Sequence, residues 1–326
     1  MNTLRIEREV REMSHKVQGT GVRAALFSAF FLGLAPVFGK AAMGPEGFSP
    51  LAVVALRTSL AALLLVLAIL VVNRSALYIY PAGLYGCILA GTVNGIGSIF
   101  YYEGLSRLNA SVAQVLYALY PFFVLFWFQL DRQSTSRLTI FRIILAIFSA
   151  YLLTKTHAGA IDIGGIVCML IAAVMYALHL PINQRVLFDV PAPTVTVYTL
   201  LAMSSIVVPA YFVFDSSWPT SMPPWTPILA LTGVTFFSRL LLFLGVKHIG
   251  GMQTALLGLG ELLVAIIFSH IILNESLTPV QWLGALGLGA SLLLVWFEKP
   301  PTHGNHPHGL LGWLQPPDFP SDYYKR

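Results

Sequence analysis

The chain has 326 residues, of which 56% are hydrophobic and only 10% are charged, whereas about 25% of residues are charged in an average soluble domain. So few charges cannot cover the surface of a soluble protein of this length, which argues against soluble enzymes, nucleic-acid-binding proteins and secreted disulfide-rich domains. The formal net charge of +5 is therefore interpreted first as a signal of membrane topology, and no nucleic-acid partner is needed to explain it.

Residues 1–21 mix basic and acidic side chains, which predicts a solvated cytoplasmic arm that can form a helix. The apolar run after this arm is long enough to span a bilayer, and it lacks the short apolar core and small-residue cleavage site of a signal peptide. We therefore expect no removable leader.

Apolar runs of about 20 residues, the length that a helix needs to cross the hydrocarbon core, recur along the chain. They predict an all-α integral membrane protein with ten transmembrane helices, at residues 22–43, 50–72, 81–105, 110–130, 138–153, 164–183, 194–214, 228–246, 251–273 and 278–297. The tail at 298–326 is rich in Pro and His and is expected to be disordered in the cytoplasm. Its three histidines are interpreted as solvated and not as metal ligands, so no metal or cofactor is expected.

The positions of Lys and Arg predict the orientation of these helices. With the N-terminus inside, most of the 19 basic residues fall in inner segments. The outer halves hold Lys40, Arg57, Arg107 and Lys155. Because the number of spans is even, both termini are expected in the cytoplasm, with the protein in the plasma (inner) membrane.

An internal repeat relates the two halves of the chain. Residues 103–110 align with residues 244–251, which lie 141 positions later, and the same shift aligns residues 120–123 with 261–264. This predicts two five-helix repeats, at residues 22–155 and 156–297. Because five is odd, the second repeat must enter the membrane from the opposite side, and transporters with such inverted repeats bind their solute between the repeats near the midplane.

Several short motifs resemble those of one family of transporters. The segment from Glu261 to Ala265, followed by residues 273–278, Gln281 and Gly284, is similar to the closing signature of the EamA family in the drug/metabolite transporter superfamily. Supporting fragments are Gly39-Lys40, Pro50 with Arg57-Thr58, and Tyr176-Ala177. The resemblance implies a ten-helix transporter that moves small metabolites outward.

The chain departs from the pattern of this family at three positions. Leu262 replaces the usual Pro, Asn274 replaces Gly, and Ser134 stands in the first repeat where the equivalent of Glu275 would be acidic. Because Pro removes a backbone hydrogen bond, its absence weakens the case for a break in the ninth span, although Gly258 and Gly260 leave that segment pliable.

Ionisable side chains near the bilayer centre cost roughly 2.5 to 3.5 kcal/mol on insertion scales, so each needs a partner, a wet cavity or a function. Glu261 and Arg239 lie deepest, at depths that differ by only a few ångströms at a helical rise of about 1.5 Å per residue. They are predicted to face each other in the bundle. The pair would either lock two helices, or change its protonation and meet an anionic group of the substrate.

Other polar residues are weaker candidates for the pathway of substrate or protons. His179 in the sixth span would either carry a proton or donate an interhelical hydrogen bond. Tyr117, Tyr120 and Tyr176, with Tyr101 and Tyr102, are expected to gather toward the inner halves of the helices, where two or three could stack a flat or cationic solute. Asn94 and Gln114 are candidate hydrogen-bonding partners of the substrate.

Near the outer face, Lys40, Arg57 and Glu103 are predicted to form a latch or an outer gate. Arg57 would extend its guanidinium outward, and Glu103 would accept a charge-assisted hydrogen bond.

Together these features predict a secondary transporter that exports a small metabolite or amino-acid-like solute by alternating access, with protons as the coupling ion. The chain has no Walker-type phosphate loop, which argues against ATP as its energy source. An enzyme is not expected, the partners are the solute and the bilayer, and a homodimer is left open. The alternatives are a flippase for a lipid-linked carrier and, less favoured, an intramembrane enzyme acting on lipid.

Overall fold

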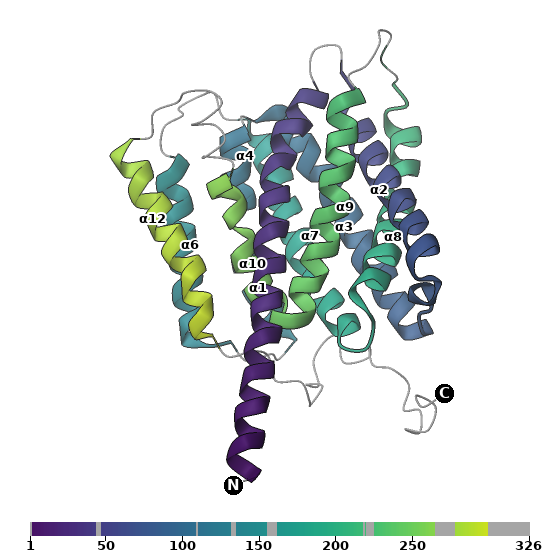
Figure 1. Cartoon of the computed structure of the whole chain (residues 1–326). Helices are drawn as coiled ribbons and strands as arrows, with labels where there is room; N and C mark the ends of the chain where they lie inside the picture. Colours follow the sequence, from purple (N-terminus) through teal and green to yellow (C-terminus); the bar gives the residue numbers. More distant parts are fainter. Residues whose placement is uncertain are drawn as a thin grey trace.

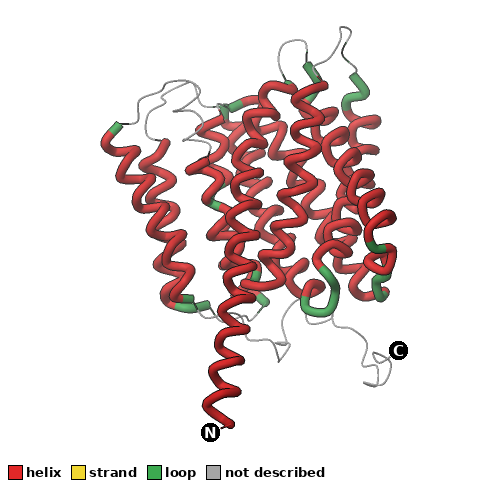
Figure 2. Tube along the Cα trace, in the orientation of Figure 1, coloured by secondary structure: helices red, strands yellow, loops and turns green. Residues whose placement is uncertain are grey.

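The computed structural model describes residues 2–43, 47–108, 110–131, 135–154, 162–217, 219, 225–264 and 278–298, and every regular element in these ranges is a helix (Figures 1 and 2). The helices are α1 (Asn2–Ala42), α2 (Pro50–Val72), η1 (Arg74–Leu77), α3 (Pro81–Arg107), α4 (Ala110–Tyr117), α5 (Tyr120–Leu130), α6 (Arg137–Thr154), α7 (Ile163–Leu187), α8 (Ala192–Phe214), α9 (Trp225–Ile249), α10 (Gly251–Gly258), α12 (Pro279–Leu293) and η2 (Leu294–Phe297). Residues 260–264 are also helical.

Seven of these helices are long and apolar enough to cross a membrane, which supports an integral, multi-pass membrane protein. Two shorter apolar helical stretches are Tyr120–Leu130 and Gly251–Val264. Each of the ten predicted spans contains helix, but the last part of the ninth, together with Asn274, Glu275 and the tail histidines, lies outside the described residues. The count of ten complete spans therefore stays a prediction.

The two halves of the chain form inverted repeats. The helix α1 runs from the end of the bundle that we call the N-terminal face to the opposite end, the far face, whereas α7 starts at the far face and runs back (Figure 1). The helix α4 begins at Ala110 and α10 at Gly251, 141 residues later, as the sequence repeat predicts. The packing follows the same symmetry, since α1 packs along α9 and α3 packs along α7.

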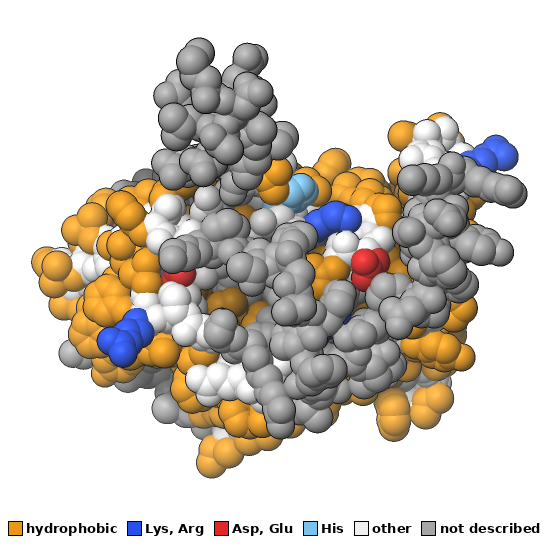
Figure 3. All heavy atoms as spheres, turned by 90° about the horizontal axis from the view of Figure 1, so that it is seen from below, with side chains coloured by type: hydrophobic (Ala, Val, Ile, Leu, Met, Phe, Trp, Pro, Cys, Tyr) orange, Lys and Arg blue, Asp and Glu red, His pale blue; other side chains and the backbone are white. Residues whose placement is uncertain are grey.

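Hydrophobic side chains cover the outside of the bundle. Seen from the N-terminal face, orange hydrophobic spheres form most of the visible rim, and few charged side chains show among them (Figure 3). Leu286 on α12 is 67% exposed and Leu229 on α9 is 60% exposed. Exposed apolar side chains of this kind are stable in contact with lipid tails, because the tails are apolar too and form no hydrogen bonds with the protein surface.

Small residues allow several helices to approach closely. A Cβ atom on Gly91 of α3 would lie 2.5 Å from the carbonyl oxygen of Thr199 on α8, and one on Gly287 of α12 would lie 2.5 Å from Ser149 Oγ on α6. The carbonyl oxygen cannot move away, so Gly91 sets the spacing between α3 and α8, whereas a side chain at Gly287 would require the Ser149 hydroxyl to turn aside.

The fourth helix of each repeat is interrupted. In the first repeat the break lies at residues 118–119, just before Pro121, and in the second it lies at Leu259, between Gly258 and Gly260. The sequence made this second break doubtful because Leu262 replaces Pro, and that doubt was wrong. A side chain at Gly258 would collide with the Tyr120 hydroxyl, so a missing Cβ, and not a Pro, makes room at the break.

A capping box explains part of the resemblance at the closing signature. The Thr278 hydroxyl accepts a hydrogen bond from the Gln281 backbone nitrogen at 3.3 Å, while the Gln281 side chain accepts one from the Thr278 nitrogen at 2.9 Å. This reciprocal arrangement satisfies two backbone donors at the start of α12.

Candidate functional site: a polar cavity between the repeats

A cavity of about 50 Å³ lies inside the bundle, lined by residues of α1, α2, α3, α4, α7 and α9 and by the start of the helix at 260–264. The side chains that give it polarity are Arg57, Asn94, Ser98, Arg239 and Glu261. It lies between two buried clusters, because Tyr117, one of its lining residues, packs against both. The cavity is therefore built from both repeats at mid-depth, where inverted-repeat transporters hold their solute.

Arg57 on α2 points into the cavity and is only 7% exposed. Its Nη1 donates to Thr235 Oγ1 at 3.2 Å and its Nη2 to Ser98 Oγ at 3.4 Å. The guanidinium carbon lies 4.8 Å from the centre of the Tyr102 ring, and Nε has no hydrogen-bond partner. Two hydroxyls and an aromatic face thus hold this cation, and among the described residues no carboxylate lies within 4.0 Å of its nitrogens.

Arg239 on α9 is 6% exposed and lines the same cavity. The local hydrogen-bonding environment assigns the amide oxygen of Asn94 to the side facing α9, where it accepts from Nη1 at 3.1 Å and from Nη2 at 3.2 Å. The guanidinium carbon lies 5.7 Å from the centre of the Tyr176 ring. Arg239, like Arg57, is held by neutral groups.

Glu261 is 5% exposed and follows directly after the break in the fourth helix of the second repeat. Its Oε1 is buried without a hydrogen-bond partner. Glu261 and Arg239 were predicted to face each other, and both do line the cavity. They form no salt bridge, because no nitrogen–oxygen distance between these two described residues falls within 4.0 Å.

Several residues of this site are paired by the pseudo-two-fold relation between the repeats. Asn94 and Ser98 lie one helical turn apart on α3, and Thr235 and Arg239, 141 positions later, lie one turn apart on α9. The positions equivalent to the two arginines carry Ser98 and Tyr198, so both buried cations break the symmetry of the duplication.

Four tyrosines complete the lining. The rings of Tyr101 and Tyr117 lie 4.9 Å apart, and those of Tyr117 and Tyr176 lie 5.4 Å apart. Tyr102, 5.2 Å from Tyr101, extends this aromatic surface toward Arg57. Tyr101, Tyr102 and Tyr117 lie in the parts of their helices nearer the far face, since α3 ends at Arg107 and α4 starts at Ala110 there. With the N-terminus inside, as the sequence predicts, these are outer halves and not the inner halves expected for the tyrosines.

Three predicted pathway residues lie beside the cavity and do not line it. Tyr120 donates to the Ala255 carbonyl oxygen at 2.7 Å, and Gln114 donates to the Tyr101 hydroxyl at 3.2 Å. His179 is fully buried one turn after Tyr176, with Nδ1 against the Tyr176 carbonyl oxygen and Nε2 without a partner. They form the layer that supports the cavity wall.

The predicted outer cluster does not form. Glu103 pairs with Arg107 on its own helix at 2.6 Å, and both side chains are exposed. Lys40 is half-buried near the end of α1. Arg57 turns inward because hydroxyls and a tyrosine ring receive it there, so its guanidinium belongs to the cavity and not to a latch with Glu103.

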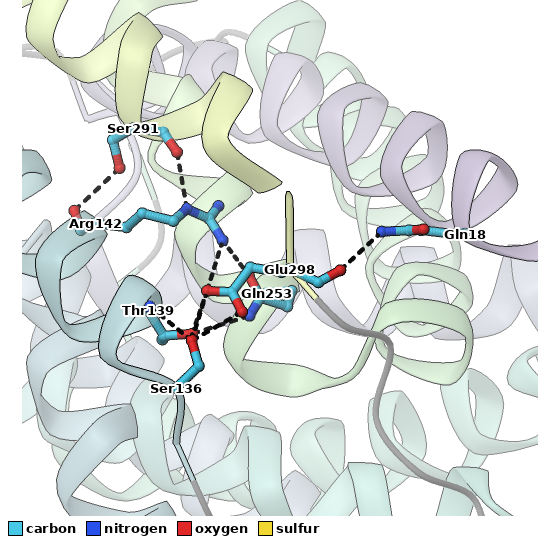
Figure 4. A network of polar contacts seen from close by, with 7 residues as sticks. All are labelled: Gln18, Ser136, Thr139, Arg142, Gln253, Ser291 and Glu298. Atoms are coloured by element: carbon cyan, nitrogen blue, oxygen red, sulfur yellow. Dashed lines mark hydrogen bonds and ion pairs between the residues drawn. The ribbon is translucent and has the colours of Figure 1, made fainter. Parts of the chain in front are cut away.

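A second polar group ties helices together at the N-terminal face. Figure 4 shows its seven residues: Gln18, Ser136, Thr139, Arg142, Gln253, Ser291 and Glu298. Arg142 on α6 is fully buried, and its Nε donates to the Ser291 carbonyl oxygen on α12 at 2.9 Å. Its Nη1 contacts the Gln253 side chain on α10 and lies 3.7 Å from a Glu298 oxygen. Sequence reasoning missed this cluster, because the basic residues of the inner segments, Arg142 among them, were interpreted only as signals of orientation.

Glu298 is the centre of this group. Its carboxylate accepts hydrogen bonds from Ser136 at 2.9 Å and from Thr139 at 2.5 Å. Its carbonyl oxygen accepts one from Gln18 on α1 at 3.3 Å. The end of the last helix is thereby fixed to α6 and α1, although the prediction had placed residue 298 in a disordered tail.

A buried ion pair closes the same face beneath the cavity. Arg185 on α7 donates to Asp131 Oδ2 at the end of α5 from Nε at 3.1 Å and from Nη2 at 2.8 Å. Both side chains are at most 2% exposed. Within the described part of the chain no group of three or more His, Cys, Asp and Glu is placed to hold a metal ion.

Comparisons with known proteins agree with this architecture. The model of the EamA-like transporter family matches the chain twice, at residues 19–155 and 163–297. A search of curated proteins gave no match. One solved structure, described only as the crystal structure of a protein, is 18% identical, with a TM-score of 0.66 over 86% of this chain and 96% of the other, and this likeness concerns the fold alone. The resemblance carried by the Glu261 segment and by Gln281 is confirmed, and the chain belongs to the EamA-like transporter family.

Proposed function

We propose that this protein is a secondary transporter that exports a small metabolite by alternating access and that protons drive its cycle. The observation that carries the proposal is the polar cavity between inverted repeats, with Arg57, Arg239 and Glu261 buried in it. Ionisable groups are costly at membrane depth and persist there where a solute or ion must be received. Similar halves that exchange conformations then open the site to each side in turn.

The polar contacts between helices support a cycle with two conformations, one closed at the N-terminal face and one open there. On the N-terminal face, the Asp131–Arg185 pair and the Arg142–Glu298 cluster hold helices together. The breaks at residues 118–119 and 259 free backbone groups next to the cavity, and such breaks are natural hinges. In our proposal, opening to the N-terminal face separates the contacts of that face while the two broken helices bend.

Glu261 is the proposed site of proton binding. A buried carboxylate without a hydrogen-bond partner on Oε1 is stabilised by a cation or by a proton. A solute that arrives with its own charge changes the electrostatic potential at Glu261, which links proton release to solute binding. The excess of basic residues on the N-terminal side supports the cytoplasm for both termini. The proposed outward direction of transport rests on the resemblance to the EamA family and not on the charges.

The composition of the cavity favours a transporter of small solutes over the two alternatives. A flippase for lipid-linked carriers needs an apolar groove for its lipid, whereas this cavity is lined by arginines, a carboxylate and tyrosine rings. An enzyme acting on lipid needs catalytic groups gathered at one membrane face, whereas Arg239 and Glu261 lie at mid-depth.

Proteoliposomes loaded with a pH-sensitive dye test the proposal. The twenty amino acids and a set of small organic acids would be added singly, and we expect at least one to drive proton movement in the wild type. Glu261→Gln should remove the proton signal, and Arg239→Gln should reduce solute uptake, while Asp215→Asn, a carboxylate change near the end of α8 beside Ser217, should have no effect. If both cavity variants fold and transport normally, the proposal fails. If the solute flux does not depend on an imposed pH gradient, the proposed coupling to protons is wrong.

A further inference from the structure

The charges that line the cavity do not balance. Arg57 and Arg239 are each at least nine-tenths buried, and their partners are hydroxyls, an amide oxygen and aromatic rings. Glu261, the carboxylate in the lining, pairs with neither arginine. Among the described residues of the lining, two cations against one separate carboxylate give an excess of positive charge, and in a low-dielectric interior such an excess attracts an anion strongly.

The two guanidinium groups are placed to act together. Arg57 bonds Ser98 and Thr235, whereas Arg239 bonds Asn94 and itself lies four residues after Thr235 on α9. Ser98 likewise lies one turn after Asn94 on α3. At about 1.5 Å per residue, the two groups therefore stand roughly 6 Å apart along the helix axes, with Arg57 nearer the far face.

We propose that the cavity recognises a solute that bears a carboxylate, held between Arg57 and Arg239, with its apolar part against the rings of Tyr117 and Tyr176. This inference rests on the proposed transport function and narrows it to a class of substrate. Guanidinium forks match the two oxygens of a carboxylate, and their hydrogen bonds to it are stronger than bonds to neutral groups. The Nε of Arg57, which lacks a partner, is available for one of them.

The opposite charge is excluded by the same groups. An organic cation in the cavity would be repelled by two guanidinium groups and attracted by one carboxylate, so the repulsion would outweigh the attraction. Solutes that carry both a carboxylate and an ammonium fit when the ammonium lies toward Glu261. An engineered cavity of about 150 Å³ admits benzene, and this cavity has about 50 Å³, so a solute with a ring requires the surrounding helices to separate.

Binding to the purified full-length protein in lipid nanodiscs tests this inference. Labelled benzoate serves as the probe in equilibrium dialysis, with phenylalanine and succinate as competitors that represent zwitterionic and dicarboxylate solutes. Benzylamine is the matched cation, with the same ring and no carboxylate. We expect at least one of the three carboxylates to bind, and benzylamine neither to bind nor to compete.

The arginine variants make the assignment specific. Arg57→Gln and Arg239→Gln should each weaken binding on the order of 10- to 100-fold, the range for losing a hydrogen bond to a charged group. Arg57→Lys and Arg239→Lys keep the charge and should lose less, which guards against variants that merely fold poorly. Arg23→Gln, which removes an exposed guanidinium on α1, should bind as the wild type does.

The outcomes separate this inference from the proposed function. Binding of benzylamine, unchanged carboxylate binding in both Gln variants, or no binding of any of the three carboxylates would each overturn the inference. If proteoliposomes transport a neutral or cationic solute in those cases, the transport proposal stands without it. Carboxylate binding that depends on Arg57 and Arg239, but without flux in proteoliposomes, would instead leave this inference in place and defeat the transport proposal.

Discussion

The hydroxyl of Tyr120 donates a hydrogen bond to the carbonyl oxygen of Ala255 at 2.7 Å and so joins the interrupted fourth helices of the two repeats. An unbroken helix would offer that carbonyl the backbone nitrogen of Leu259, which here bonds Leu257 instead. The tyrosine therefore satisfies an acceptor that the break sets free. It does so directly beside the cavity, since its ring lies 4.9 Å from that of Tyr176.

Replacing Tyr120 by Phe removes this bond and leaves the ring in place. The expected loss is about 1 kcal/mol of stability, the typical contribution of one hydrogen bond, together with slower transport because the two breaks are no longer linked. Tyr198→Phe is the matched control, because its hydroxyl also donates to a carbonyl oxygen, that of Leu77, at 2.7 Å. The melting temperature should fall by a similar amount in both variants. Equal transport rates in the two variants would contradict the special role of Tyr120.

A methyl group at Gly33 should disturb the position of Glu261. A Cβ there would lie 2.8 Å from the Glu261 carbonyl oxygen and 2.9 Å from Val264 Cβ. Overpacking of this kind costs about 1–3 kcal/mol, and the shift would reach the cavity through Glu261. Gly33→Ala should therefore reduce both melting temperature and solute flux.

Gly233→Ala is the control for that variant. Nothing lies within 4 Å of the added atom, and Ala has the higher helix propensity, so its melting temperature should stay the same or rise. A Gly33→Ala protein that behaves like Gly233→Ala would show that the contact between α1 and residues 260–264 is loose.

The two ion pairs of the N-terminal face should differ in their contribution to stability. Asp131→Asn removes the buried carboxylate that pairs with Arg185, and breaking a buried ion pair from one side costs about 3–5 kcal/mol. Glu298→Gln should cost less, because Glu298 lies 3.7 Å from Arg142, which keeps its bond to Ser291 at 2.9 Å. Chemical unfolding in detergent measures both. A larger loss for Glu298→Gln than for Asp131→Asn would reverse our assignment of the stronger link.

The helical segments could be predicted from the sequence because apolar runs of spanning length decide them. The helix α2 covers residues 50–72, as predicted, since Pro50 and Asn73 mark its ends. The inverted repeat followed from the odd number of spans in each copy. These features depend on local composition and on counting, which need no knowledge of contacts.

The contacts within the site could be predicted only in part. Depth along a helix can be read from residue number, so Arg239 and Glu261 were rightly placed in one layer. The direction in which each side chain points around its helix axis could not be predicted. Nearly every face of these helices is apolar, so no periodicity marks the face that points inward. The same lack of periodicity led to an outward reading for Arg57, which lies near a helix end and yet turns inward.

Long-range polar contacts left no signal in the sequence. Arg142 and Arg185 look like ordinary basic residues near the cytoplasm, and their partners Glu298 and Asp131 lie 156 and 54 positions away. Only packing brings them together. The break at Leu259 was only doubted, because the signal expected for it was Pro, whereas the structure uses the missing side chain of Gly258, a residue that the sequence had marked as pliable.

The central claim is that the cavity between the repeats opens to both sides of the membrane, and accessibility at Ser98 tests it most directly. A Ser98→Cys protein would be made in a background with Cys87→Ala and Cys168→Ala, which removes both native cysteines. A membrane-impermeant thiol reagent would then be applied to sealed vesicles from one side or the other. We predict that it modifies Ser98→Cys from each side, more slowly from the N-terminal face, which buried ion pairs close. Modification from one side alone would contradict alternating access through this cavity.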